Sequence, residues 1–178
     1  MGEWDLCLSS TQAFRSSPFF QSIRALFGDG EDKSIAENGF SLHALATSTG
    51  KVGRVRQTIQ PDTTKNDSLS LTSAVDIEVG IFPSVPAKVK GTVITTATVD
   101  VVSSELWEMY VKGTKVIGSN VPLLDQLLDD YPIEVPVGEL YQKIRGTVPT
   151  ANIKTLYVDE SMRIARDMDD NFYVFTRP

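Results

Sequence analysis

Apolar and polar residues alternate with a period of two along most of this chain. In the clearest case, residues 69–81, the odd positions are Leu, Ser, Val and Ile, while Asp76 and Glu78 lie among the even ones. This pattern is typical of a β-strand with one buried face. Further strands are expected at 4–9, 40–47, 52–60, 87–102 and 105–117, weakly at 139–144, and in a closing hairpin, 162–166 and 172–176, into which 150–158 leads.

One apolar segment follows helical rather than strand spacing. Ser16-Ser17-Pro18 has the chemistry of a helix N-cap with proline at the first helical position, and Gly28 is suited to end the helix. Two interpretations remain open: a plug packed on the end of a barrel, or a lid that dips into a membrane. The residues that would contact a membrane or partner are Phe19, Phe20, Leu26 and Phe27.

Eight or nine strands joined mostly by short turns predict an all-β fold. Helical pieces are expected only after the first strand and around residue 124, where 122–130 is an amphipathic helix or an apolar loop. We expect one domain, residues 1–178, forming an antiparallel barrel of about eight strands with one short apolar helix after the first strand. The alternating Val, Ala and Thr residues fit either a narrow cavity or a packed core.

Charge and residue inventory exclude several kinds of site. The net charge of −6 argues against a nucleic-acid binder, which needs clustered Lys and Arg. With a single His and a single Cys, a zinc site of the usual kind is not expected. Any nucleophile–histidine pair would have to use His43, which we interpret as structural. Cys7 is expected to be a structural thiol within a strand. We therefore expect no catalytic residues, no metal and no enzymatic activity.

The two ends of the chain resemble a known family. Gly2-Glu-Trp4 resembles the start of lipocalin-type barrels, in which Trp packs against an Arg of the last strands. Residues 2–11 and 156–166 are similar to the opening and closing segments of the plastid lipid-associated (fibrillin) proteins of plastids and cyanobacteria. The chain departs from that pattern at Leu8, at Leu156 and at Asp167-Met168, and residues 103–150 match it poorly.

This resemblance implies a lipocalin-like barrel without enzymatic activity. The protein would bind lipid or isoprenoid, or act structurally, at plastid thylakoid or plastoglobule surfaces or in the stroma. The implied ligand is an apolar small molecule such as a lipid, carotenoid or prenyl quinone, with no other cofactor. The alternative is a packed barrel that acts as a peripheral interaction subunit or assembly factor of a photosynthetic membrane complex. An enzyme with a small apolar substrate is a third hypothesis, which requires His43 in a pocket beside an acid.

Four residues form the candidate site that the resemblance singles out: Trp4, Asp159, Arg163 and Arg166. They could bind the polar head of an amphiphile at the barrel mouth, because Arg offers a forked donor. They could instead lock the barrel, with Asp159 pairing an Arg across the hairpin and an Arg packing on Trp4. We favour the lock. Arg54 and Arg56 present the same choice, and the acids 76, 78, 129–130 and 169–170 are interpreted as solvated or turn residues.

Overall fold

The computed structural model describes residues 1–27, 51–65, 67–80, 88–121 and 150–178, together with 125–126, 134–136, 139, 142–143 and 146. Within these ranges the strands are β1 (Gly2–Ser9), β2 (Lys51–Pro61), β3 (Ser68–Gly80), β4 (Lys88–Val101), β5 (Leu106–Ile117), β6 (Glu134–Val135), β7 (Thr150–Val158), β8 (Met162–Arg166) and β9 (Phe172–Thr176). A 3₁₀ turn, η1 (Ala13–Ser16), leads into helix α1 (Pro18–Phe27).

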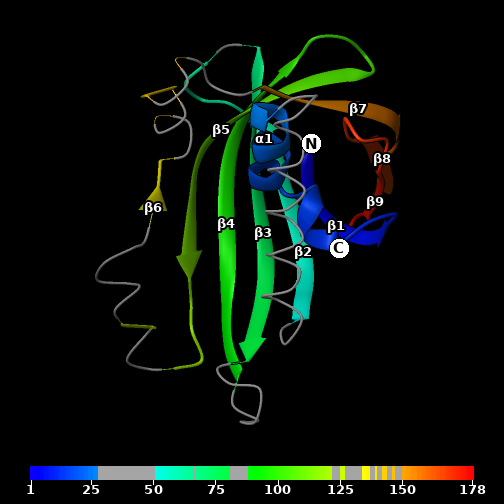
Figure 1. Cartoon of the computed structure of the whole chain (residues 1–178). Helices are drawn as coiled ribbons and strands as arrows, with labels where there is room; N and C mark the ends of the chain where they lie inside the picture. The colour runs from blue at the N-terminus through cyan, green and yellow to red at the C-terminus, as the bar shows by residue number, and fades with distance from the viewer. Residues whose placement is uncertain are drawn as a thin grey trace.

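Eight of these strands form a closed, barrel-like ring. Neighbours pair antiparallel in the order β1, β2, β3, β4, β5, β7, β8, β9, and β9 returns to β1. The ring is uneven, because β1 covers only residues 56–59 of β2 and β7 covers only residues 106–110 of β5. The long strands β2 to β5 therefore run well past the short strands, as Figure 1 shows. The mainly antiparallel fold, with a short helix after its first strand, is confirmed.

The inward faces of the strands supply the core. In β3 the buried residues are Ser68, Leu71, Ser73 and Val75, and the last three lie on the predicted face. The same alternation buries Ala97 and Val99 of β4. The largest set of buried residues in mutual contact consists of Trp4, Ile59, Leu71, Val99, Met109, Ala151, Ile153, Ala165, Tyr173 and Phe175. The buried apolar residues of these two strands thus follow the period-two spacing of their sequences.

Helix α1 packs against the inside of the ring. Ser17 is extended and its carbonyl accepts the Gln21 N–H at 3.2 Å, so Pro18 occupies the first helical position as predicted. The helix contacts β4, β5 and β7, and Figure 1 shows it in front of the upper part of the long strands. Phe19 packs against the Ala97–Val111 pair, and the Phe20 ring centroid is 4.6 Å from that of Phe14. This packing is that of a plug. The side chains of residues 26 and 27 lie outside the described part.

One irregular strand and one failed expectation have identifiable reasons. A β-bulge between Leu6 and Leu8 interrupts the alternation of β1 and turns Leu8 to the outer face, where it is 56% exposed, and not to the face of Trp4. The weak strand expected at 139–144 is wrong, because its described residues, Glu139, Gln142 and Lys143, are helical. That segment is rich in good helix formers. The strand expected at 40–47 and most of 122–130 lie outside the described residues.

Two valines of β4 test this account of the core. Val99 is 0% exposed and Val101 is 47% exposed. Val99→Ala should lower the free energy of unfolding by about 2 kcal/mol, because it removes buried methyl groups and leaves a cavity. Val101→Ala, the matched control, should change it by less than about 0.5 kcal/mol. Urea unfolding followed by tryptophan fluorescence measures both. Equal effects would contradict the difference in burial between these two positions of β4.

Candidate functional site

Trp4 joins the two ends of the chain. It is 2% exposed, and the guanidinium carbon of Arg163 lies 5.8 Å from its ring centroid. That of Arg177 lies 3.8 Å from the same centroid. Both distances are in the range of cation–π contacts. The contact expected between Trp4 and an arginine of the closing strands is therefore present through Arg163, and Arg177 adds a second one that the sequence did not suggest.

Arg163 is a cation held inside the ring. It is 3% exposed, its guanidinium carbon lies 4.3 Å from the Phe175 ring centroid and 5.7 Å from that of Trp107, and its Nη2 donates to Gln57 Oε1. Burial, with a further contribution from Arg177, lowers its pKa to about 9. The side chain therefore stays charged at neutral pH. Among the described residues no carboxylate pairs with it, so aromatic faces and one amide oxygen surround the charge.

Arg177 clamps the first strand to the β7–β8 turn. Its Nη2 donates to the Met1 carbonyl at 2.7 Å, its Nη1 to the Glu3 carbonyl at 3.1 Å and its Nε to the Glu160 carbonyl at 3.1 Å. Gly2 lies beneath this clamp with φ +114°, and a Cβ at this position would be 2.5 Å from Arg177 Nη1. The positive φ and the close approach of Arg177 explain why glycine occupies this position of the Gly-x-Trp motif.

Asp159 caps a turn and does not pair with an arginine in the described part of the chain. Its carboxylate accepts hydrogen bonds from the Tyr157 hydroxyl at 2.7 Å, from the Ser161 N–H at 2.7 Å and from the Met162 N–H at 2.7 Å. The Tyr157 hydroxyl and these backbone donors hold the pKa of this carboxyl well below its usual range. The expected Asp–Arg pair across the hairpin is thus replaced by an Asx-type turn.

Arg166 is not brought to Trp4. It lies on the outer face of β8, where its Nη1 is 3.6 Å from the carboxylate of Asp170, and both side chains are exposed. Such a surface pair contributes little to stability. Arg54 pairs with Asp5, and Arg56 lies 3.8 Å from Asp76. These three arginines therefore lie on the outer surface, apart from the closure around Arg163.

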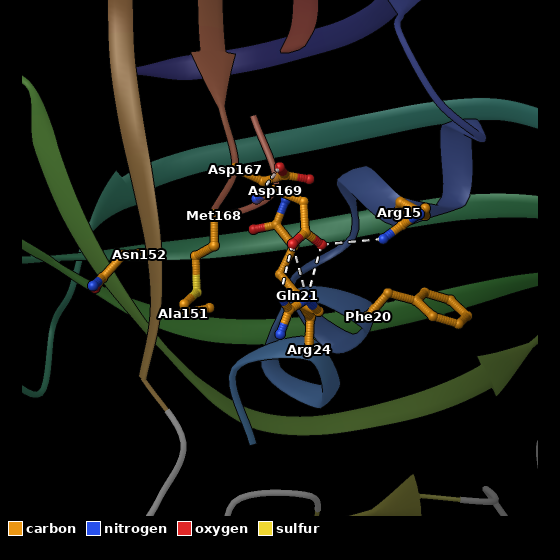
Figure 2. A pocket seen from close by; sticks show the side chains of 9 residues that line it. All are labelled: Arg15, Phe20, Gln21, Arg24, Ala151, Asn152, Asp167, Met168 and Asp169. Atoms are coloured by element: carbon orange, nitrogen blue, oxygen red, sulfur yellow. Dashed lines mark hydrogen bonds and ion pairs between the residues drawn. The ribbon is translucent and has the colours of Figure 1, made fainter. Parts of the chain in front are cut away.

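A second anchor, which the sequence missed, ties the last turn to the helix. Arg24 donates to Asp169 through Nε at 2.9 Å and through Nη2 at 2.8 Å, and Arg15 Nη2 lies 3.3 Å from the same carboxylate. Figure 2 shows Asp169 above α1 with dashed lines to both arginines. Beside it, Asp167 accepts a 2.7 Å hydrogen bond from the Tyr173 hydroxyl, whose pKa burial raises. The sequence predicts only a solvated or turn acid at Asp169, because the arginines that bind it lie about 150 residues away along the chain.

Between the described strands and the helix, the interior of the ring holds little space. A cavity of about 20 Å³ lies between the strands and the helix, and its polar lining includes Gln21, Gln57 and Arg163. Sites for drug-sized ligands occupy about 300–1,000 Å³. This cavity could hold a water molecule but not a lipid chain. Of the two interiors left open by the sequence, the described structure has the packed one.

A larger, open groove of about 560 Å³ lies where the long strands pass beyond the short ones. Charged side chains line much of it, and most of them are paired: Glu78 lies 3.6 Å from Lys90, and Asp76 accepts a hydrogen bond from Thr92 at 2.9 Å. The solvated, polar character expected of Asp76 and Glu78 is confirmed. This lining suits a polar ligand better than an apolar one.

The described residues include few groups that could bind a metal ion or act as a catalytic nucleophile or base. They contain no group of three or more His, Cys, Asp and Glu side chains that could hold a metal ion. His43 lies outside them, so its surroundings stay a prediction. Cys7 is exposed, and its Sγ donates to the Val174 carbonyl at 3.3 Å. Within the same residues, no helix combines the length and apolar character needed to cross a membrane.

Gly2→Ala tests the clamp. The added Cβ meets Arg177 and the backbone has φ +114°, so the free energy of unfolding should fall by about 1–3 kcal/mol. The control Gly118→Ala, at φ +64° with no atom within 4 Å of its Cβ, should lose only about 1 kcal/mol. In an Arg177→Met background the Gly2→Ala loss should shrink, because the clashing group is gone. An unchanged loss in that background would rule out the clash.

Asp159→Asn tests the cap through pH. The pKa of Asp159 is lowered in the folded state, so its charge stabilises the fold above the unfolded pKa of about 3.9 and ceases to do so as pH falls below it. The variant should be less stable than the parent at pH 7, and the difference should shrink between about pH 5 and pH 2. Urea unfolding at several pH values measures this. Glu160→Gln, in the same turn, should show no such trend; an identical trend there would contradict a specific role for Asp159.

Comparison of the chain with protein-family models, with curated proteins and with solved structures gives no match. The resemblance of its two ends to the plastid lipid-associated proteins therefore stays a prediction. The geometry adds that Trp4 and Arg163, two of the residues that carry this resemblance, are in contact although they are far apart in sequence.

Proposed function

We propose that this protein is a non-enzymatic lipid- or isoprenoid-binding or structural protein of plastid thylakoid or plastoglobule surfaces. The resemblance to the plastid lipid-associated family supports this proposal, since the closing contact of Trp4 with Arg163 is what a lipocalin-like barrel of that kind would need. With an interior cavity of only about 20 Å³, the lipid would be contacted from the outside of the ring.

The observation that carries this proposal is a row of apolar side chains across the outer face of four strands. Leu8 of β1 is opposite Val174 of β9, which is opposite Ile164 of β8, which is opposite Tyr157 of β7. Directly paired residues share a face of the sheet. Leu8 is 56% exposed and Tyr157 45% exposed. Contiguous exposed apolar side chains of this kind mark contact sites for membranes or proteins.

Basic residues next to this apolar row favour a lipid surface. Lys154 of β7 is opposite Arg166 of β8, and Arg166 is opposite Phe172 of β9, so these three form the neighbouring row. Each cation near an anionic lipid surface contributes about 1 kcal/mol. An apolar row with a basic border is the arrangement by which interfacial segments bind such surfaces. Asp170 pairs with Arg166, so this border carries two basic side chains and one acidic one.

A second candidate function is that of a peripheral interaction subunit or assembly factor of a photosynthetic membrane complex. The packed interior favours it, since a barrel without room for an enclosed ligand can serve as a rigid binding module. The same apolar row would then be covered by a partner chain. The two candidate functions differ in what binds to the apolar row. The first predicts binding to lipid alone, and the second predicts binding to a partner protein.

Sedimentation with vesicles tests the proposal. The delipidated protein is mixed with vesicles of neutral galactolipid, with or without an anionic lipid. Leu8→Ser and Tyr157→Ser should each weaken binding by about tenfold, because each removes an apolar side chain from the contact. Val102→Ser is the matched control, since Val102 is also 56% exposed but lies outside the row; it should bind like the parent.

Three other results would count against the proposal. Failure of the parent protein to bind either vesicles or a prenyl quinone would contradict the lipid function. Saturable quinone binding that is unaffected by Leu8→Ser would place the ligand elsewhere than at the row. Salt-resistant co-purification with photosystem or antenna subunits, lost in Leu8→Ser without any vesicle binding by the parent, would favour the interaction subunit.

A further inference from the structure

A chain of buried hydrogen bonds crosses the inside of the ring from β8 to α1. Arg163 Nη2 donates to Gln57 Oε1, and Gln57 Nε2 donates to the Ser16 carbonyl at 3.1 Å. Gln21 Nε2 donates to the same carbonyl at 3.4 Å. Because Gln57 uses both its oxygen and its nitrogen, the orientation of its amide is fixed, and the bond to Ser16 fixes that of Gln21.

Both ends of this chain are polar atoms without a partner in the described structure. Arg163 Nε–H is a buried donor, and Gln21 Oε1 is a buried acceptor. The two residues are 3% and 8% exposed, so bulk water does not solvate them. Buried polar groups in folded proteins are nearly always hydrogen-bonded, by protein or by ordered water. One free donor and one free acceptor are complementary to a group that can both accept and donate.

The cavity of about 20 Å³ lies between the strands and the helix, next to both residues. Arg163 and Gln21 both line it, together with Gln57 and Ser16. A buried water needs about 10–15 Å³ and two to four polar partners. The cavity therefore fits one water molecule and excludes any organic group of the size of a lipid head.

We propose that this cavity is an internal hydration site that holds one water molecule. The water accepts a hydrogen bond from Arg163 Nε–H and donates one to Gln21 Oε1. The hydrogen bonds then form a closed cycle that joins β8, β2 and the start of α1. A small anion such as a halide would satisfy Arg163 but would face the carbonyl oxygen of Gln21, which repels negative charge. The chemistry of the two ends thus favours water. This site does not depend on the proposed lipid function.

A high-resolution crystal structure of the full chain, with a second crystal soaked in bromide, tests this site. We expect a single solvent peak within hydrogen-bond distance of Arg163 Nε and Gln21 Oε1, and no anomalous bromide signal there. In solution, oxygen-17 magnetic relaxation dispersion counts waters with long residence times. Gln21→Leu removes the acceptor, so this variant should lose one long-lived water. Gln60→Leu, on the exposed side of β2, should lose none.

Each other outcome overturns the proposal. An empty cavity, or a direct contact of Arg163 Nε with a protein acceptor, removes the need for water. A bromide peak in the cavity identifies an anion site instead. If Gln21→Leu retains the parent's number of long-lived waters, Gln21 is not the acceptor. Should that variant fail to fold, the crystal structure of the parent still decides, because it shows the cavity directly.

Discussion

The burial of one guanidinium, that of Arg163, governs how this ring of strands closes. A buried cation loses the water that would solvate it, so other groups must stabilise its charge. No described carboxylate pairs with Arg163. The faces of aromatic side chains and one amide oxygen stabilise the charge here. The compensating groups, Trp4, Gln57 and Phe175, come from β1, β2 and β9. These strands can solvate the charge only when they surround it together. Closure of the ring and solvation of Arg163 are therefore one physical requirement.

The closing hairpin β8–β9 is held at both of its ends. At one end, Arg177 donates to the carbonyl groups of Met1 and Glu3 and to that of Glu160 in the β7–β8 turn, while Asp159 caps that turn. At the other end, Asp169 binds Arg15 and Arg24 and so connects the β8–β9 turn to the helix. A short hairpin is marginal by itself in water. Contacts at both of its ends tie the hairpin to the rest of the ring of strands, so it is stabilised together with them.

The packing between the described strands and the helix determines which surfaces remain for contact with a partner. Its core combines large apolar side chains with a polar chain of hydrogen bonds, and α1 fills the end of the ring. Surface left for contact with an apolar partner is therefore on the outside, where β-bulges in β1 and β7 turn Leu8 and Tyr157 outward. The bulges that disturb the regular register are thus what creates the apolar row.

The sequence by itself determined the helix, most of the described strands and the inner face of β3, because period-two and helical spacing are local properties. The segments 162–166 and 172–176 match β8 and β9 residue for residue, and the contact of Trp4 with a closing arginine was expected. Only the tertiary structure decided that Arg163 rather than Arg166 makes it, that Asp159 caps a turn, and that Arg177 and Asp169 are anchors. Those outcomes depend on which strands become neighbours and where a bulge shifts the register, and partners up to 176 residues apart leave no local pattern.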